Sequence, residues 1–364
     1  MTNIDKLDLL KNTTVLASPV LVKKPILSVR VVTYNHVQFV SKCLSSVLSQ
    51  ETNFDFEIIV CDDCSNDGTI DVLNDLHLKN PCSIKILQSN KNFGHYTGSG
   101  FFNAYRFFEH ARGIYYSFLE GDDYWTSNCK LQSQVDILNN NPNLTGTFHR
   151  ASNLDNKRSI FLPNSFGPEG NSREYNSFDF LRLGNIVPSS SFVTRSKYFR
   201  FTQGTKIGFF TDLSLHFNLL ELGPYFFLDS TLSVYRLHKR GIHSKIPYPD
   251  KLKHLLLSLT TYYSVLSKSS KLKEKLGSKI SNICIQLSKL YFHQLNIDLA
   301  NYYFKKSKKY SFSYKNEKEF SFMLENTLCW IVTFSFRYLK AYGPIKFLVL
   351  VFNYVNSFFK TNED

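Results

Sequence analysis

The chain has 364 residues, of which 43% are hydrophobic and 20% are charged, so it is neither disordered nor too short to bury a large core. This length accommodates one large domain with an appendage, or two domains. The net charge of +13 is uneven, because residues 250–364 carry 18 Lys and Arg against 8 Asp and Glu, which leaves only +3 on the first 249 residues. The basic C-terminal third is either a solvated helical face or a surface for an anionic partner.

The N-terminal segment shows no targeting signal. Residues 1–11 lack the apolar core of a signal peptide, and we expect residues 1–24 to form a loosely ordered leader. No run of 18 uncharged apolar residues predicts a transmembrane helix. The seven cysteines are scattered, and the pair Cys61 and Cys64 has no second pair that would complete a zinc site. These features predict reduced thiols and a cytoplasmic protein.

From residue 26 onward, β-prone apolar runs alternate with segments of helical periodicity. The expected strands are 26–32, 56–60, 83–88 and 114–119, and the expected helices are 37–48, 69–78, 98–111 and 125–140. Such an alternation predicts an α/β fold with a mostly parallel sheet that is flanked by helices on both faces.

The regular alternation weakens beyond residue 144. Residues 151–185 are rich in Gly, Pro, Asn and Ser and are expected to form loops, followed by a helix at 215–222 and a β-prone run at 225–237. Lys-rich helical patterns begin at residue 251 and give way to an aromatic, apolar segment at 320–359. The expected organisation is therefore the leader, one domain at 25–247 and a basic, aromatic-rich helical region at 248–364.

Polar side chains follow each of the first four expected strands. They are Thr33, Tyr34 and Asn35 after the first strand, Asp62 and Asp63 after the second, Asn92 after the third, and Glu120, Asp122 and Asp123 after the fourth. The carboxyl ends of parallel strands meet at one edge of a sheet, where open α/β sheets bind their ligands, so these residues are expected to become neighbours. Three carboxylates within four positions are stabilised by a divalent cation or a cationic ligand, and the alternative is an exposed turn.

Two common phosphate-binding loops are excluded. A dinucleotide site would need GxGxxG after the first strand, where the chain has Thr33-Tyr34-Asn35-His36 instead, and no Walker A sequence occurs. A diphosphate bound at this edge would therefore need a metal ion to neutralise it, and the acidic cluster offers suitable oxygen ligands.

Three segments together resemble family 2 glycosyltransferases of the GT-A fold, of the bacterial cell-surface polysaccharide type. They are residues 29–35, residues 57–69 and residues 120–125, and the resemblance extends over about residues 25–245. It implies a Rossmann-like half that binds the nucleotide and a second half that binds the acceptor. It also implies transfer of a sugar from a nucleoside diphosphate, with inversion at the anomeric carbon.

The resemblance also implies roles for individual residues. Thr33 and Asp63 match positions that contact the nucleoside base, and Asp62 matches a neighbouring donor position; Tyr34, Asn35 and Asn92 complete the expected donor site. Asp122 and Asp123 match the DxD region, which holds Mn²⁺ or Mg²⁺ and the ribose–diphosphate. Glu120 stands where Asp is more usual, and it remains a suitable ligand for a hard cation.

Two further segments resemble motifs of the same family. Asp212 matches the acidic base that deprotonates the acceptor hydroxyl, although an acid near a helix N-terminus is also favoured electrostatically. Arg236 and His238 match a YRxH segment that contacts the diphosphate or metal, and the alternative for Arg236 is packing on the acidic edge. Trp125 is expected to be either a core residue or a wall of the acceptor site.

The expected function is an inverting, metal-dependent glycosyltransferase of cell-envelope polysaccharide assembly. Its expected partners are a nucleoside-diphosphate sugar, a glycan or lipid-linked saccharide acceptor, and an anionic membrane surface bound through residues 251–360. It would be cytoplasmic or peripheral on the inner face of the cytoplasmic membrane, and nucleic acid is not an expected partner. The alternative is a catalytically inactive scaffold of this fold that binds membrane or nucleic acid through its basic C-terminal region. A nucleotidyltransferase would need a Gly-rich loop with a basic residue after the first strand, which this chain lacks.

Overall fold

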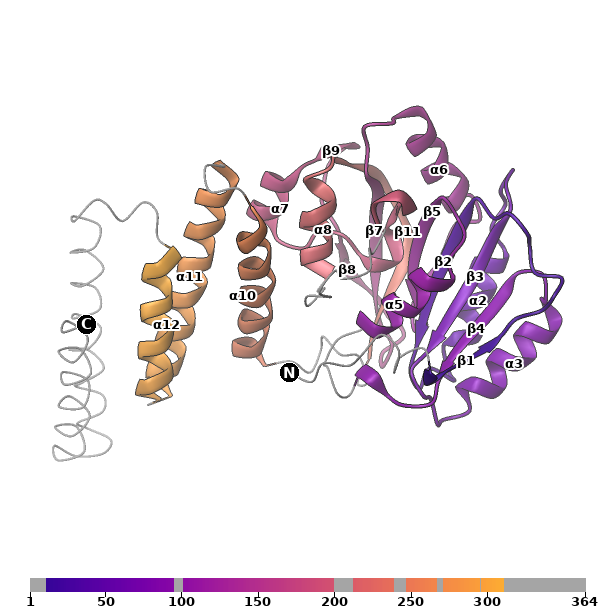
Figure 1. Cartoon of the computed structure of the whole chain (residues 1–364), viewed down its shortest axis with the longest axis horizontal. Coiled ribbons are helices and arrows are strands. Elements are labelled where there is room, and N and C mark those ends of the chain that lie inside the picture. Colours follow the sequence, from indigo (N-terminus) through magenta and orange to yellow (C-terminus); the bar gives the residue numbers. More distant parts are fainter. Residues whose placement is uncertain are drawn as a thin grey trace. The chain divides into compact units, whose positions relative to one another are not determined.

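The alternation of strands and helices in the first half of the chain builds one large sheet (Figure 1). The computed structural model describes residues 11–94, 101–199, 212–238, 247–266, 271–294 and 296–310. The chain divides into two compact units, Met1–Ile246 and Pro247–Asp364. Within the first unit, four parallel strands form the centre of the sheet: β2 (Leu27–Thr33), β3 (Phe56–Asp62), β4 (Ile84–Ser89) and β5 (Tyr115–Glu120).

Apolar residues on the central strands explain why both faces of the sheet are covered. Helices pack on one face through a shared core with the strands, and these are α2 (Val40–Leu48), α3 (Thr69–Lys79) and α6 (Lys130–Asn140). The other face receives α5 (Phe101–His110), whose Phe107 ring lies against Tyr116 and Phe118 of β5. The expected α/β architecture with helices on both faces is therefore confirmed.

The second half of the first unit extends the sheet beyond β5. The strand order is β1-β4-β3-β2-β5-β10-β7-β11-β6, with β8 beside β7 and β9 beside β11. The added elements are β6 (Tyr124–Trp125), β7 (Gly146–Asp155), β8 (Ile160–Phe166), β9 (Arg173–Tyr175), α7 (Ser177–Leu183), η1 (Ser189–Ser191), β10 (Val193–Arg195), η2 (Ser196–Phe199), α8 (Asp212–Leu220) and β11 (Tyr225–Leu237). Strand β11 pairs with β7 in parallel and with β6 in antiparallel orientation, so it brings the end of the unit back to the acidic segment after β5.

Two predictions from composition were wrong. Residues 151–185 are not loops, since they contain the end of β7, all of β8 and β9, and α7, which begins with a capping box between Asn176 and Asp179. Strand β8 is mostly exposed, so no apolar alternation marks it in the sequence. The second wrong prediction is the loosely ordered leader at residues 1–24, which contains β1 (Thr13–Leu16) paired with β4. An edge strand of this kind is held by backbone hydrogen bonds and needs little burial, so composition does not reveal it.

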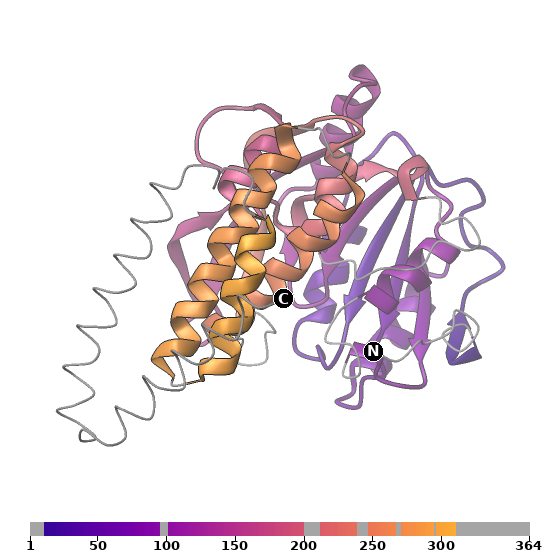
Figure 2. The ribbon, with the colours of Figure 1, turned by 60° about the vertical axis from the view of Figure 1, so that its left-hand side comes forward.

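The second unit is helical as far as it is described. It contains α10 (Tyr248–Val265), α11 (Lys271–His293) and α12 (Ile297–Tyr310), and Figure 2 shows α11 and α12 lying side by side. The rings of Tyr291 and Tyr303 stack between α11 and α12 with centroids 5.6 Å apart. Within the described ranges, no helix combines the length and the apolar character needed to span a membrane. The expected apolar segment at 320–359 lies outside the described residues.

A lysine is buried in the core beneath the acidic segment. The Lys130 side chain is fully inaccessible, with Nζ 3.2 Å from Ser117 Oγ and 4.2 Å from the centroid of the Trp125 ring. Burial lowers the pKa of the Lys130 amine well below its usual value. Burial also lowers the pKa of His149 well below its usual value, and the positive charge of Lys130 lowers it further by a smaller amount.

We predict that Lys130→Met stabilises the protein at neutral pH. An unfolded lysine keeps its proton up to about pH 10, whereas the buried amine of the folded protein binds a proton less tightly. Lys130 therefore lowers the free energy of unfolding at pH 7, and this loss shrinks as the pH rises toward 10. The substitution should raise the free energy of unfolding by about 1–3 kcal/mol at pH 7. Urea unfolding should show that this gain shrinks toward pH 10.

The exposed Lys79 on α3 provides a matched control, since Lys79→Met should change the free energy of unfolding by less than about 0.5 kcal/mol. A loss of stability in Lys130→Met at pH 7 would mean that the contact of the charged amine with Trp125 outweighs its burial.

Candidate functional site

The carboxyl ends of the central strands meet at one edge of the sheet, as expected from their parallel order. Thr33 at the end of β2 lies opposite Asp62 at the end of β3, and Val32 lies opposite Glu120 at the end of β5. Two backbone hydrogen bonds continue this pairing beyond the strands, from Asp63 N to Thr33 O (3.0 Å) and from Gly121 N to Val32 O (2.7 Å). We call this edge, with the residues that follow β2, β3, β4 and β5, the acidic rim.

The segment after β2 is held by the segment after β3. Asn35 adopts a left-handed backbone conformation (φ 56°), its backbone N–H donates to Ser65 Oγ (2.9 Å), and its side-chain Oδ1 accepts from Asn66 N (2.9 Å). The Tyr34 side chain is 45% exposed at the rim. Thr33 Oγ1 is buried and has no hydrogen-bond partner among the described residues, so its hydrogen-bonding capacity is unused there.

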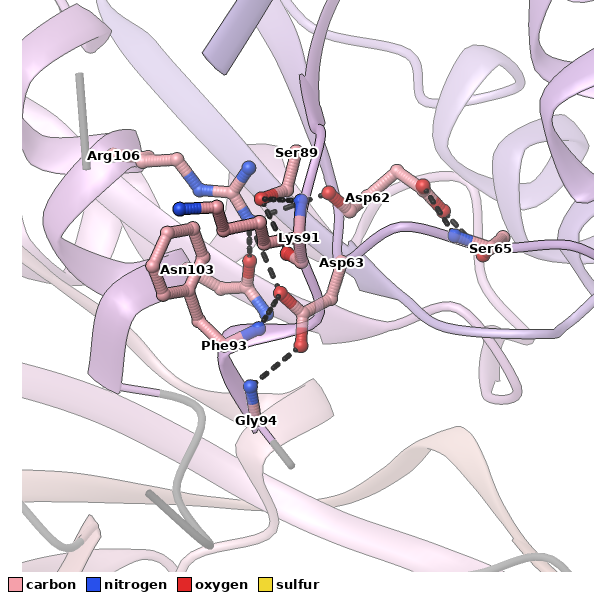
Figure 3. Close-up of polar contacts among 9 residues, drawn as sticks. All are labelled: Asp62, Asp63, Ser65, Ser89, Lys91, Phe93, Gly94, Asn103 and Arg106. Carbon is pink, nitrogen blue, oxygen red and sulfur yellow. Dashed lines mark hydrogen bonds and ion pairs between the residues drawn. The ribbon is translucent and has the colours of Figure 1, made fainter. Parts of the chain in front are cut away.

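Figure 3 shows Asp62, the last residue of β3, and Asp63, which follows it. Asp62 accepts hydrogen bonds from Ser65, at 2.9 Å from the backbone N and 2.5 Å from Oγ. Burial raises the pKa of Asp62. Asp63 instead accepts from the backbone N–H groups of Phe93 (3.1 Å) and Gly94 (2.8 Å), so it fixes the segment after β4 that also contains Asn92. A Cβ at Gly94 would lie 2.9 Å from Asp63 Oδ2, which explains the glycine.

Arg106 is a rim residue that sequence reasoning missed. It lies on α5 and is fully buried, with Nη2 3.3 Å from the backbone O of Asp62 and 3.7 Å from Asp63 Oδ1 (Figure 3). Asn103, one turn earlier, also accepts a hydrogen bond from Arg106. Nε and Nη1 of Arg106 have no hydrogen-bond partner among the described residues. No sequence signal distinguishes this arginine, because its neighbours Tyr105 and Phe107 make the helix look like ordinary core.

The three carboxylates after β5 point to three different partners. Glu120 forms an ion pair with Arg30 (3.5 Å), and Asp122 Oδ2 lies 2.9 Å from Nε2 of His238. Asp123 Oδ1 accepts a hydrogen bond from the backbone N of Arg236 (2.9 Å). Burial and the neighbouring Asp122 charge raise the pKa of Asp123 well above its usual range. For Asp122, burial is outweighed by the hydrogen bond with His238 and by His36, and its pKa is lowered.

The residues at and after the end of β5 could hold a cation only together with a bound ligand. In the described part of the chain, no three His, Cys, Asp or Glu side chains are grouped to hold a metal ion by themselves. Asp122 and His238 do converge, and one or two protein ligands suffice for a cation that is also bound by substrate phosphates. The residues therefore fit a divalent cation that arrives with a diphosphate, and a direct contact of Asp123 or Glu120 with that cation stays a prediction.

Strand β11 contributes the remaining expected residues. The Arg236 guanidinium lies over the rings of Phe39 (5.2 Å) and Tyr124 (4.8 Å), and its Nη1 donates to Asn156 Oδ1 (3.1 Å). Asp212 is the first residue of α8, and its side chain lies outside the described structure.

Trp125 belongs to the core and is not a wall of an acceptor site. Its side chain is 4% exposed, and its Nε1 donates to the backbone O of Ser190 (2.8 Å). The structure therefore decides between the two alternatives that the sequence left open for this residue.

A cavity of about 690 Å³ lies at the opposite end of β5, around Tyr115 and Tyr116. Two of its cations already have protein partners: Arg112 donates from Nε to Glu57 (2.9 Å), and Arg195 donates to the backbone O atoms of Leu144 and Leu138. We therefore place the functional site at the acidic rim and not in this cavity.

Comparisons with known proteins identify the sequence family of this chain. Residues 28–199 match the sequence family described as Glycosyl transferase family 2. An uncharacterized protein of Mycobacterium tuberculosis is 30% identical over 233 residues, which cover 62% of this chain and 63% of that protein. A putative teichuronic acid biosynthesis glycosyltransferase of Bacillus subtilis is 32% identical over 115 residues, which cover 32% of this chain and 42% of that protein. The chain thus spans less than two thirds of the length of these relatives.

A solved structure shows the same fold. The crystal structure of S. aureus TarS in complex with UDP-GlcNAc superimposes with a TM-score of 0.51 at 15% sequence identity, over 80% of this chain and 93% of that one. The GT-A type of fold expected from the sequence is therefore confirmed.

Proposed function

Since the chain belongs to glycosyl transferase family 2 through residues 28–199, we propose that it transfers a sugar from a nucleoside diphosphate to a hydroxyl group of an acceptor. The observation that carries this proposal is the acidic rim, where Thr33, Asp63 and Asp122 come from three strands to one edge of the sheet. The reaction proceeds with inversion and with a divalent cation, Mn²⁺ or Mg²⁺. The catalytic domain spans residues 25–247.

The donor nucleotide binds along the first three strand ends. Thr33 and Asp63 contact the base, with Tyr34, Asn35, Asp62 and Asn92 around it. In support, Thr33 Oγ1 has no hydrogen-bond partner in the described part of the chain, and Tyr34 presents an exposed ring for stacking. Arg106 acts behind this surface, because its guanidinium lies beside the Asp63 carboxylate and balances its charge.

The diphosphate lies against Asp122 and His238. These two residues would hold the cation, with Asp123 and Glu120 close by, and Arg236 would add positive charge at the same end. When bound, the cation neutralises the charge that develops on the departing diphosphate.

Asp212 acts as the general base. Its carboxylate takes the proton of the acceptor hydroxyl as the new C–O bond forms and the bond from the anomeric carbon to the diphosphate oxygen breaks. Attack from the face opposite the diphosphate inverts the anomeric carbon.

The acceptor is a glycan or a lipid-linked saccharide of cell-envelope polysaccharide assembly. The family membership and the teichuronic acid biosynthesis relative support this class. The proposed location is the cytoplasm, either free or peripherally bound at the inner face of the cytoplasmic membrane.

We predict that Asp122→Asn and Asp212→Asn each lower the turnover number at least about 1,000-fold, for different reasons. Asp122→Asn removes a charged ligand of the cation, so it should also abolish Mn²⁺-dependent binding of the donor diphosphate. Asp212→Asn removes only the base and should leave that binding intact. Calorimetry with UDP, GDP, ADP, CDP and dTDP, each with Mn²⁺, measures the binding, and product formation from the matching sugar nucleotides measures turnover.

Asp136→Asn on the exposed side of α6 is the matched control and should leave both quantities unchanged. Undiminished turnover in Asp212→Asn would refute the base assignment. If no nucleoside diphosphate binds, while RNA or DNA binds tightly and in a salt-sensitive way, the inactive scaffold becomes the better description.

Membrane binding through the second unit is a separate prediction. Helix α12 carries Lys305, Lys306, Lys308 and Lys309 in its last two turns, with an exposed Tyr302 one turn before them. Each such cation contributes about 1 kcal/mol near an anionic surface, so changing all four to Gln should weaken binding to phosphatidylglycerol vesicles at least about 100-fold. Co-sedimentation measures this, and equal binding of the unchanged protein to neutral phosphatidylcholine vesicles would contradict it.

A further inference from the structure

His36 lies at the acidic rim, one residue beyond the segment that resembles the family motif. The left-handed turn at Asn35 directs the chain toward the segment after β3, where the backbone N of His36 donates to Thr69 Oγ1 (2.9 Å). Its imidazole is 17% exposed, with Nε2 3.8 Å from Asp122 Oδ2. The backbone contact and the ring contact together fix His36 between two segments of the rim.

The acidic segment after β5 packs directly on the His36 ring. A Cβ at Gly121 would lie 2.9 Å from His36 Nδ1 and 3.0 Å from Thr33 Cβ, so only a glycine allows this approach. Nδ1 itself is buried and has no hydrogen-bond partner among the described residues. The other ring nitrogen, Nε2, faces Asp122, the next residue after Gly121.

Asp122 is approached by two imidazoles and not by one. Its Oδ2 atom lies 2.9 Å from Nε2 of His238 and 3.8 Å from Nε2 of His36. The two rings stand nearly perpendicular, with centroids 6.5 Å apart, and both contact the ring of Phe39. The resemblance accounts for His238 but assigns no role to His36.

We propose that His36 is a positioning residue that orients the Asp122 carboxylate toward the diphosphate end of the donor. This inference rests on the proposed function, because it needs Asp122 to meet the diphosphate and its cation. Groups that contact a metal-binding carboxylate from outside set its orientation, and their removal typically weakens metal affinity 10- to 100-fold. A separation of 3.8 Å is longer than a hydrogen bond, and such contacts often tighten when the ligand binds.

Three forms of the full chain test the proposal: the unchanged protein, His36→Ala and His36→Gln. Calorimetry measures the dissociation constant of the best-bound nucleoside diphosphate with Mn²⁺, and that of the corresponding nucleoside without diphosphate. His36→Ala should weaken diphosphate binding about 10- to 100-fold and leave nucleoside binding unchanged. His36→Gln should restore part of the loss, because its amide keeps an N–H donor on the side that faces Asp122.

The outcomes distinguish a failure of the proposed function from a failure of the role assigned to His36. If the unchanged protein binds no nucleoside diphosphate with Mn²⁺, the proposed function fails. If it binds one and His36→Ala binds it equally well, the role of His36 is refuted and the proposed function stands. A parallel loss of nucleoside and diphosphate binding in both variants, with a lowered melting temperature, would make His36 a packing residue only and also overturn the proposal.

Discussion

The crowding of negative charge at one edge of the sheet is the constraint on which this structure depends. Five carboxylates lie at the ends of β3 and β5 or within three residues beyond them, and carboxylates that are close together and partly buried repel one another unless each has its own partner. The partners differ from residue to residue: a serine for Asp62, two backbone N–H groups and an arginine for Asp63, an arginine for Glu120, imidazoles for Asp122 and a backbone N–H for Asp123.

These partners tie distant elements to the acidic rim. Arg106 anchors α5 to the end of β3, and the backbone N of Arg236 together with the His238 ring anchors β11 to the segment after β5. The pairing of β11 with β6 and β7 therefore places the carboxyl end of β11 beside the segment that follows β5.

The central part of the fold was predictable because its signals are local. Parallel strands buried on both faces appear as continuous apolar runs, and the helices between them keep their own period, so β2 to β5 and the rim were expected correctly. The strands in the 151–185 region were not predictable in this way. Strand β8 is held mainly by its backbone pairing with β7, and its exposed side chains carry no apolar alternation. Composition alone therefore suggested loops.

The sequence by itself determined which carboxylates meet at the rim, because strand ends in a parallel sheet converge wherever the strands are correctly identified. Only the tertiary structure decided which partner each carboxylate takes. Arg106 reaches Asp62 across 44 positions, and no local pattern marks this contact. His238 reaches Asp122 across 116 positions, and the resemblance placed His238 near the diphosphate or metal without pairing it with Asp122. The same holds for His36, whose place beside Asp122 follows from the turn at Asn35 and the missing side chain of Gly121. Such contacts are set by three-dimensional packing, which a one-dimensional pattern does not encode.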